Sequence, residues 1–534
     1  MVRPPMVEAG TDVPRARLGI QGLDDILGGG LPRNHLYLID GEPGTGKTTL
    51  ALQFLLDGVR QGERGMYVTL SESAEELKAV ARSHGWTLDG IEIYELAKES
   101  GRDIEEGYTL FHPAEVELQQ TVDDVLAAVT RQNPLRIAFD SLSEMRLLAR
   151  DPLRFRRQIL AIKQFFRDRE ATVMLLDDKT SPDGDLQLHS LAHGVIVLEH
   201  VALEYGSERR RLQVTKVRGI QFRGGFHDFR IVSGGIEVYP RVLQDEPRLD
   251  VTDQQILSGS EALDALLGGG ITCGTSTLIT GAAGTGKSIL CTQFARAELN
   301  RGKKVLFYLF DERMSTFQLR SRALGMSTED AKASGQLRIA QVEPTELSPG
   351  EFASQVVRAV EDDGVALVII DSINGYMQSM PEERLLPIQI HELLSFLSNN
   401  GCTCIMTLVQ HGIFGNPVDE AAEVSYLADT VLLLRYFEVN GTVRQAMSVV
   451  KKRSGDHERT IREYKVQKGG LLVGQPLSEF QGVLTGVPHY TGGSAPLLEA
   501  ADGRGDLTEQ SSKAENHAED GVAEHGRQRS KQSH

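Results

Sequence analysis

The sequence contains the same phosphate-loop pattern twice, and this repetition limits the possible folds more than any other feature. The pattern G-x-x-x-x-G-K-[S/T] occurs at 41–48 as GEPGTGKT and again at 281–288 as GAAGTGKS. A Leu-Gly-Gly-Gly run precedes each copy, with its glycines beginning at 28 and at 268. Loops and glycine runs are therefore both 240 residues apart. This spacing indicates duplication of a whole domain, because solenoid repeats have much shorter periods.

Each loop lies between an apolar run and a segment with helical periodicity. The runs at 35–40 and 276–280 predict strands, and helices are expected to begin at Thr48 and Ser288. Further apolar runs recur in step in both halves, at 65–70, 136–140, 305–310 and 366–371. Such strands, alternating with helices, are typical of a parallel sheet buried on both faces. The predicted fold class is α/β: two tandem P-loop domains, each a mostly parallel sheet with helices on both faces.

Changes in composition suggest where the domains begin and end. We expect a flexible leader at 1–15, a first domain at 16–239, a linker at 240–253 and a second domain at 254–489. Residues 490–534 are rich in Gly, Ser, Glu, Asp, Gln and His, and are expected to form a disordered tail.

The two loops predict binding of a nucleoside triphosphate. Glycines let backbone N–H groups approach the phosphates, the lysine meets the β/γ charge, and the following helix adds its positive dipole end. Two matches in register disfavour the alternative of a plain glycine-rich turn. The residues expected to contact the nucleotide are Gly41, Gly44, Thr45, Gly46, Lys47, Thr48 and Thr49, and Gly281, Gly284, Thr285, Gly286, Lys287, Ser288 and Ile289.

A Mg²⁺ ion is the expected cofactor of each site. The hydroxyls of Thr48 and Ser288 can bind it directly, and a carboxylate at the end of a buried strand can hold its water shell. Asp140 and Asp371 each end an apolar run and precede a serine. The alternative is that these aspartates only cap the next helix.

Hydrolysis also needs a carboxylate that orients or deprotonates the attacking oxygen. The candidates follow the second strand of each domain: Glu72 after Ser71, and the pair Asp311 and Glu312. Because a paired acid offers both an orienting contact and a base with a raised pKa, the second site is expected to be better equipped. The alternative is that Ser71, Ser73 and Asp311 are ordinary helix caps.

A basic pair occurs near the end of each domain, Lys216 with Arg218 and Lys451 with Arg453. This spacing places both side chains on one side of a strand. They are candidates to stabilise charge on the γ-phosphate, supplied by a neighbouring subunit. The alternative is an ordinary solvated strand face.

Composition narrows the range of partners. The formal net charge of −17 opposes attraction to nucleic acid or anionic membranes. No apolar run reaches the length of a membrane span, and the first residues do not form a secretory signal. The four cysteines are Cys273, Cys291, Cys402 and Cys404, and their spacing fits neither a zinc knuckle nor a redox pair. We expect a soluble, cytoplasmic protein with reduced thiols.

Taken together, these motifs resemble the KaiC family of bacterial RecA-like tandem ATPases. The resemblance spans about 15–485 and includes GIQGLDDILGGG at 19–30, RSHGW at 82–86 with RALGM at 322–326, KVRG at 216–219 and SYLADT at 425–430. It implies a double-ring hexamer with ATP held between subunits. It also implies that Lys216, Arg218, Lys451 and Arg453 reach the nucleotide on the next subunit.

The resemblance further implies protein autokinase activity in the second domain. The family transfers phosphate to adjacent Ser and Thr residues, and this sequence has Ser425 followed by Tyr426. One-site autophosphorylation at Ser425, with Glu312 as the base, is therefore the expectation. The protein would be an ATPase and serine autokinase that acts on a signalling partner not named by its sequence.

Two other functions compete with this interpretation. The same core drives DNA motors and recombinases, which need basic or aromatic pore loops. The segment 410–423, where such a loop might lie, is acidic and carries one aromatic residue. The other alternative is a scaffold that binds ATP to assemble but scarcely hydrolyses it, which Ser71 makes plausible for the first domain.

Overall fold

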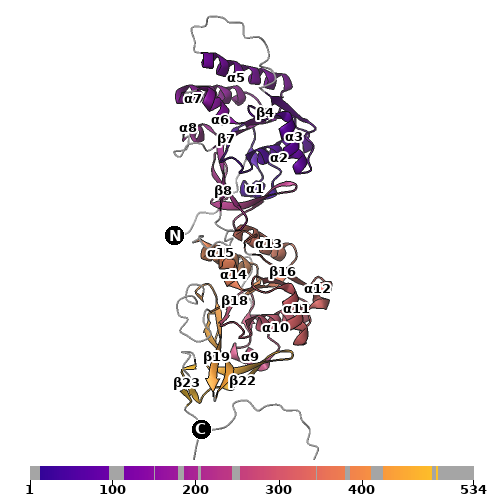
Figure 1. Ribbon diagram of the computed structural model, residues 1–534, viewed down its shortest axis with the longest axis vertical. Coiled ribbons are helices and arrows are strands. Elements are labelled where there is room, and N and C mark those ends of the chain that lie inside the picture. Colours follow the sequence, from indigo (N-terminus) through magenta and orange to yellow (C-terminus); the bar gives the residue numbers. More distant parts are fainter. Residues whose placement is uncertain are drawn as a thin grey trace, which may run out of the picture. The chain divides into compact units, whose positions relative to one another are not determined.

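The computed structural model describes residues 13–95, 113–149, 151–178, 186–202, 206–242, 253–343, 345–378, 385–410, 425–439, 441–483 and 489–490. Two nine-stranded sheets, one in each half of the chain, form the centres of two α/β domains (Figure 1). The predicted fold class is confirmed. Most of the expected leader, linker and tail lies outside the described residues, so the domain boundaries stay a prediction. No helix in the described ranges is both long and apolar enough to cross a membrane.

The first domain alternates strands and helices over most of its length. Its strands are β1 (Arg15–Ala16), β2 (Leu31–Pro32), β3 (Leu36–Gly41), β4 (Gly65–Thr69), β5 (Ile91–Glu95), β6 (Arg136–Asp140), β7 (Thr172–Asp178), β8 (Gly194–Val201), β9 (Arg209–Val217), β10 (Phe226–Val232) and β11 (Gly235–Tyr239). Its helices are α1 (Gln21–Ile26), α2 (Lys47–Arg60), α3 (Ala74–Ser83), α5 (Pro113–Gln132), α6 (Leu142–Ala149), α7 (Pro152–Arg167) and α8 (Leu186–Leu191).

The large sheet of this domain has the order β11-β10-β9-β8-β3-β7-β6-β4-β5. The six strands from β8 to β5 run parallel, whereas β9, β10 and β11 extend the sheet through antiparallel pairs. Parallel strands need crossover connections, and the intervening helices supply them. The parallel part places the carboxyl ends of β3, β4, β6 and β7 along one edge, where ligands bind in such sheets.

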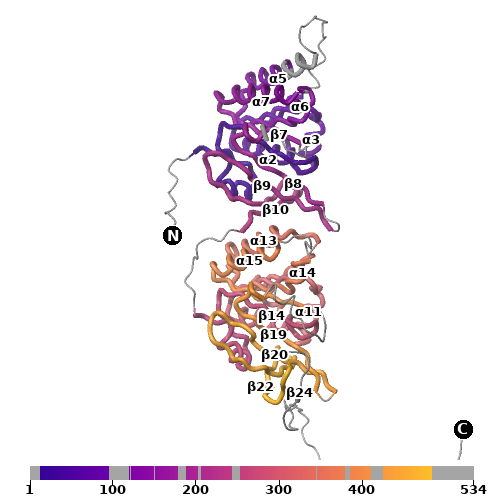
Figure 2. The backbone as a smooth tube through the Cα atoms, turned by 90° about the vertical axis from the view of Figure 1, so that its left-hand side faces the viewer, coloured from indigo at the N-terminus to yellow at the C-terminus, as the bar shows by residue number. Residues whose placement is uncertain are grey.

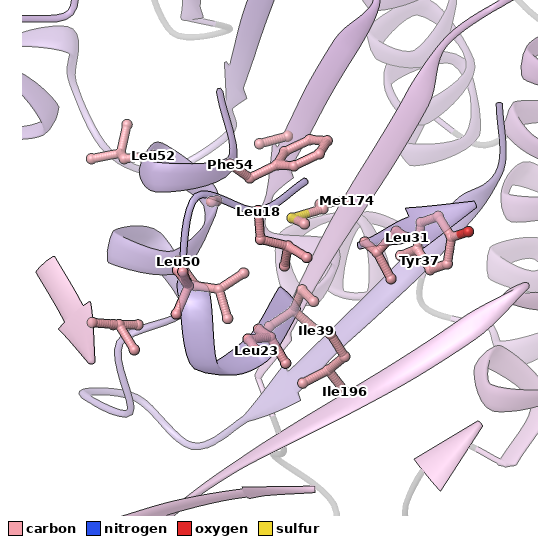
Figure 3. Packing of buried hydrophobic residues seen from close by; sticks show 14 of the residues in the cluster. Leu18, Leu23, Leu31, Tyr37, Ile39, Leu50, Leu52, Phe54, Met174 and Ile196 are labelled. Carbon is pink, nitrogen blue, oxygen red and sulfur yellow. The ribbon is translucent and has the colours of Figure 1, made fainter. Parts of the chain in front are cut away.

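Each face of the first sheet has its own hydrophobic core. Successive side chains of a strand point to opposite faces, so Tyr37 and Ile39 join one cluster while Leu36 and Leu38 join the other. Helices α1, α2 and α3 cover the first face, and α5, α6, α7 and α8 cover the second (Figure 1). Figure 3 shows Phe54 of α2 beside Leu18 and Met174 in the first cluster. Burial of both faces explains why the strands are nearly continuous apolar runs.

The second domain repeats this arrangement. Its strands are β12 (Gln255–Ile256), β13 (Ile271–Thr272), β14 (Ser276–Gly281), β15 (Lys304–Leu309), β16 (Leu337–Gln341), β17 (Val365–Asp371), β18 (Thr403–Val409), β19 (Thr430–Val439), β20 (Thr442–Lys452), β21 (Arg462–Gln467), β22 (Gly470–Pro476), β23 (Phe480–Gln481) and β24 (His489–Tyr490). Its helices are α9 (Glu261–Leu266), α10 (Lys287–Asn300), α11 (Met314–Ala323), α12 (Glu329–Ala333), α13 (Pro349–Glu361), α14 (Ile373–Gln378) and α15 (Leu386–Asn399).

The second large sheet has the order β16-β15-β17-β18-β14-β19-β20-β21-β22. In this order, the six strands β16, β15, β17, β18, β14 and β19 are parallel. Strands β20, β21 and β22 extend the sheet through antiparallel pairs, as β9, β10 and β11 do in the first domain. Figure 2 shows β14, β19 and β20 following one another across this sheet. Helices α9, α10 and α11 pack on one face and α13, α14 and α15 on the other.

Candidate nucleotide sites

Both phosphate loops follow the central strand of their sheet directly. Strand β3 ends at Gly41 and α2 begins at Lys47, while β14 ends at Gly281 and α10 begins at Lys287. Each helix thus begins one residue earlier than the sequence suggested. The residue before each helix is a left-handed glycine, Gly46 with φ 99° and Gly286 with φ 94°. Glycine adopts this conformation without the steric cost that a Cβ would add.

The amino ends of α2 and α10 lack side-chain caps, which fits a phosphate ligand. Ser73, Asp151 and Ser348 accept backbone N–H groups in the first turns of α3, α7 and α13, whereas α1, α9, α11, α12 and α15 also lack such caps. No side-chain cap bond forms at Gly46 or Gly286. The first-turn amides of α2 and α10 are therefore available to an anion, which the positive end of the helix dipole also favours.

The loop lysines fold back over their own loops. Lys47 Nζ donates to the carbonyl oxygens of Gly41 at 2.8 Å and Glu42 at 3.0 Å. Lys287 Nζ makes the same contacts with Gly281 and Ala282, both at 2.8 Å. One difference is large: Lys47 also forms an ion pair with Asp178 at 2.8 Å. Asp178 was not anticipated from the sequence.

In the first site, the arrangement of side chains fits Mg²⁺. Thr48 Oγ1 lies 3.2 Å from Asp140 Oδ2, and the hydroxyl of Tyr67 donates to the same oxygen at 2.5 Å. Burial raises the pKa of Asp140, although hydrogen bonds from Tyr67 and Thr48 oppose that rise. A hydroxyl beside one carboxylate suits an ion that takes its other ligands from phosphate and water.

In the second site, Asp371 holds the corresponding position at the end of β17. Its Oδ1 accepts a hydrogen bond of 2.5 Å from Thr407, and its Oδ2 is buried with no hydrogen-bond partner among the described residues. A buried carboxylate oxygen without a partner is costly unless a ligand or water satisfies it. This orphaned oxygen fits a hydrated metal ion held beside Ser288.

The acids after the second strands differ in their counter-ions, although burial raises the pKa of both Glu72 and Glu312. Glu312 is bound by both of its oxygens to Arg320, at 2.6 and 2.7 Å. In the first site, Glu72 Oε2 is buried with no partner in the described part of the chain. Burial, reinforced by the charge of Asp140, raises the pKa of Glu72. Position 80, which corresponds to Arg320, is Val80, so the first acid lacks this particular counter-ion.

The competing interpretation as helix caps holds for one residue only. Ser73 caps α3 and forms a capping box with Glu76. The N-cap residue of α11 is Arg313, not Asp311, and Asp311 instead accepts a hydrogen bond from Ser372. Glu72 and Asp311 therefore remain candidates for chemistry.

The basic pairs lie at the opposite edge of each sheet. In the first domain, Val217 pairs with Gly194, which pairs with Tyr37, four residues before the end of β3. In the second, Lys452 pairs with Thr430, which pairs with Thr277, four residues before the end of β14. Four residues of strand span roughly 13 Å. The Lys-x-Arg pair at the end of β9 or β20 thus lies at the opposite end of the sheet from the P-loop that follows β3 or β14.

These basic side chains bind backbone carbonyls, with both lysines partly buried and both arginines, Arg218 and Arg453, exposed. Lys216 Nζ donates to His189 O at 2.6 Å and Ala192 O at 2.7 Å. Lys451 Nζ donates to Ala428 O at 2.6 Å and to the carbonyl of Ser425 at 2.9 Å. Arg218 and Arg453 make equivalent contacts, with Ser190 O at 3.1 Å and Tyr426 O at 3.2 Å. Ser425 therefore lies at the basic edge, away from the P-loop of its own domain.

Tyr67, Asp178, Arg320 and Thr407 were not predicted from the sequence. Only Asp178 carried a usable signal, because it ends an apolar strand just as Asp140 does. The four cysteines behave as expected: all are free thiols, and burial raises the pKa of Cys402 to about 12. The acidic segment considered as a DNA-facing loop lies, apart from Gln410, outside the described residues.

Comparison with known proteins identifies the relatives of this chain. A family model described as the KaiC ATPase matches residues 16–242 and again 256–478. The circadian clock protein KaiC3 of Synechocystis sp. is 26% identical over 499 residues, covering 91% of this chain and 97% of that protein. The circadian clock oscillator protein KaiC of Thermostichus vulcanus is 25% identical, covering 91% and 93%. That of Synechococcus elongatus is 24% identical, covering 89% and 92%. The chain therefore belongs to the KaiC ATPase family, whose domains bind ATP.

Proposed function

We propose that this protein is an ATPase that assembles with copies of itself, so that each ATP lies between two subunits. The observation that carries the proposal is the placement of P-loops and Lys-x-Arg pairs at opposite edges of each sheet. A lysine or arginine about 13 Å along the strand from its own phosphate loop cannot contact the phosphates held there. A neighbouring copy that presents its basic edge to the P-loop edge can supply that contact. A ring of six such copies is our proposal, based on the resemblance to the family.

For hydrolysis, the residues of each P-loop edge would act together. In the first site, Lys47 and the first-turn amides of α2 bind the phosphates, and Thr48 with Asp140 would hold Mg²⁺. The metal ion would neutralise charge on the β- and γ-phosphates. Glu72 orients a water molecule and accepts its proton as the water oxygen bonds to the γ-phosphorus. The bond between that phosphorus and the β–γ bridging oxygen breaks, and ADP leaves.

We further propose that the second domain transfers phosphate to Ser425 of a neighbouring subunit. Asp429 N donates to Ser276 O at 2.9 Å, which holds the segment after Ser425 at the start of β14, far from the loop after Gly281. Ser425 Oγ would attack the γ-phosphorus bound at Lys287 of another copy. The serine proton passes to Glu312, and ADP leaves as the β–γ bridge breaks.

The biological role we propose is that of a regulator whose nucleotide or phosphorylation state is read by a signalling partner. The relatives described above are named as circadian clock proteins. In this chain the residue after Ser425 is Tyr426, whose side chain is exposed. A phenol replaces the second hydroxyl of the family's pair, which favours a one-site cycle over a two-site cycle.

Phosphopeptide mapping after incubation with Mg²⁺ and ATP tests the kinase part of this proposal. The full-length chain is compared with Lys287→Ala, which removes the lysine of the second site, and with Ser425→Ala, which removes the acceptor. Phosphate at Ser425 that disappears in both variants supports transfer by the second domain. ATP hydrolysis without label at Ser425 would leave an ATPase and refute the autokinase.

A further inference from the structure

The first ATP site contains a carboxylate that the second site replaces with an apolar side chain. Asp178 ends β7, next to the central strand, and pairs in register with Gly41 of the phosphate loop. Its side chain forms the ion pair with Lys47 at 2.8 Å and accepts a hydrogen bond of the same length from Ser143. At the equivalent place in the second sheet, Gly281 pairs with Val409. The two domains therefore differ at a position beside the loop lysine.

The contacts of Asp178 hold its carboxylate in place. Ser143 lies on α6 and Lys47 opens α2, so Asp178 joins helices from both faces of the sheet. Hydrogen bonds from Lys47 and Ser143 outweigh partial burial and lower the pKa of Asp178, so the group is charged at neutral pH. Val409 instead has its backbone fixed by Asn374, whose side-chain oxygen accepts Val409 N at 2.7 Å. Both positions are well defined, but only one carries charge.

A fixed negative charge on the loop lysine opposes the binding of a γ-phosphate. The lysine of a P-loop is the group that meets the β- and γ-phosphates. With Asp178 on the same Nζ, a triphosphate must displace the carboxylate or share the lysine with a like charge nearby. A diphosphate ends one phosphate earlier and meets less of this repulsion. The penalty should therefore be larger for ATP than for ADP.

We propose that Asp178 determines the nucleotide preference of the first site, shifting it towards ADP relative to the second site with Val409. The inference rests on the proposed function only in requiring that both P-loops bind adenine nucleotides. It assigns Asp178 a role in selecting between nucleotides, not in the chemical step. It also implies that the first site is occupied by ADP for more of each cycle than the second.

Calorimetric titration of the full-length chain with Mg²⁺ and either ADP or the non-hydrolysable analogue AMP-PNP tests this assignment. Lys287→Ala confines binding to the first site. The chain with Lys287→Ala alone is then compared with the chain that also carries Asp178→Val. We expect Asp178→Val to lower the Kd for AMP-PNP about tenfold and the Kd for ADP less than about threefold. Asp178→Asn removes the charge but keeps the side-chain shape. Like Asp178→Val, it should lower the Kd for AMP-PNP more than the Kd for ADP, so it tests the proposal even if Asp178→Val fails to fold.

The reciprocal substitution provides the matched control. In a Lys47→Ala chain, Val409→Asp should raise the Kd for AMP-PNP at the second site more than the Kd for ADP. An equal change for both nucleotides, or none, in the Asp178 variants overturns the proposal. So does an unchanged Kd with loss of hydrolysis, which would place Asp178 among the groups that position the attacking water. If the parent chains bind neither nucleotide, the proposed function itself fails, which is a separate result.

Discussion

At the residue scale, the charged groups beside the two P-loops differ although the loops themselves match. Glu312 is bound to Arg320, and Lys47 is bound to Asp178. The corresponding residues in the other domain are Val80 and Val409, respectively. Each site thus has one ion pair whose counterpart in the other site is replaced by a valine. The two ion pairs involve different functional groups. The Arg320–Glu312 pair involves the candidate acid that orients water, and the Lys47–Asp178 pair involves the lysine of the phosphate loop.

Replacing Arg320 should release the candidate base of the second site. In a Lys47→Ala chain, which confines turnover to the second domain, we expect Arg320→Val to raise steady-state phosphate release about threefold to tenfold. Arg320 lowers the pKa of Glu312 against the rise caused by burial. Without Arg320 that pKa rises further, and the acid limb of the pH–rate profile should move to higher pH.

The control for this prediction is Arg322→Val, which removes an arginine of the same helix whose ion pair with Glu329 is exposed. It should leave turnover and the pH profile unchanged. A fall in turnover in Arg320→Val alone would mean that Glu312 works only while Arg320 holds it.

A second prediction concerns Asp24, which is buried and accepts Leu18 N at 2.8 Å and Gly19 N at 3.2 Å. Burial raises the pKa of Asp24 to about 6, above its unfolded value of 3.8. Its contribution to stability is therefore complete below pH 3.8 and is lost as the pH rises through about 6. Between pH 5 and 7.5 the wild type should lose about 1.4 kcal/mol relative to Asp24→Asn, the equivalent of one pKa unit.

Urea unfolding of both chains at the two pH values measures this difference. A difference between wild type and Asp24→Asn that does not change with pH would show that Asp24 does not titrate in this range.

At the element scale, the strand, loop and helix order around each P-loop is what prepares an anion site. The loops carry left-handed glycines and the helices begin without side-chain caps, so the first-turn N–H groups are available to a phosphate. The same sheet supplies Asp140 or Asp371 from a strand two positions away from the central one. The site is therefore a property of neighbouring strand ends and not of the loop alone.

Two glycines with similar backbone angles allow the effect of a substitution on ATP binding to be distinguished from its effect on stability. Gly44 in the loop has φ 82° and Gly62 after α2 has φ 80°, and a Cβ at either would meet nothing within 4 Å. Alanine at either position should cost about 1 kcal/mol of stability because L-residues disfavour this conformation. Only Gly44→Ala should weaken ATP binding, by about tenfold or more, because its backbone belongs to the phosphate cradle. Thermal unfolding and titration with ATP measure the two effects, and equal binding by both variants would argue against the cradle.

The sequence predicted the parts of each site that lie close together in the chain or at the ends of apolar strands. The P-loops, Asp140 and Asp371 were found in this way, because loop pattern and strand periodicity are local signals. The ion pairs Arg320–Glu312 and Lys47–Asp178 could not be found from the pattern alone. Each depends on which helix face or strand neighbour meets the loop, and that is decided by sheet order. The expectation of a better second site counted acids without their counter-ions, and it stays a prediction.

At the scale of the whole molecule, each domain is built with two different functional edges. The P-loop edge holds the groups proposed to bind phosphate and metal, while the other edge holds Lys216 and Arg218, or Lys451, Arg453 and Ser425. Two surfaces of one chain that bind each other generate a head-to-tail assembly, which is a ring if the rotation between subunits closes and a filament if it does not. Duplication of the domain would give two such rings from one set of subunits.

Complementation between inactive subunits tests whether one subunit completes the ATP site of the next. Lys47→Ala is present in every chain to silence the first site; one variant adds Lys287→Ala, and the other adds Arg453→Ala, whose side chain is largely exposed. Each variant alone should hydrolyse little ATP. After mixing without nucleotide and then adding Mg²⁺ and ATP, an intact P-loop on one subunit can meet an intact Arg453 on the next. We expect the mixture to release phosphate well above the average of the two separate samples; release equal to that average would show that ATP sites are not shared between subunits.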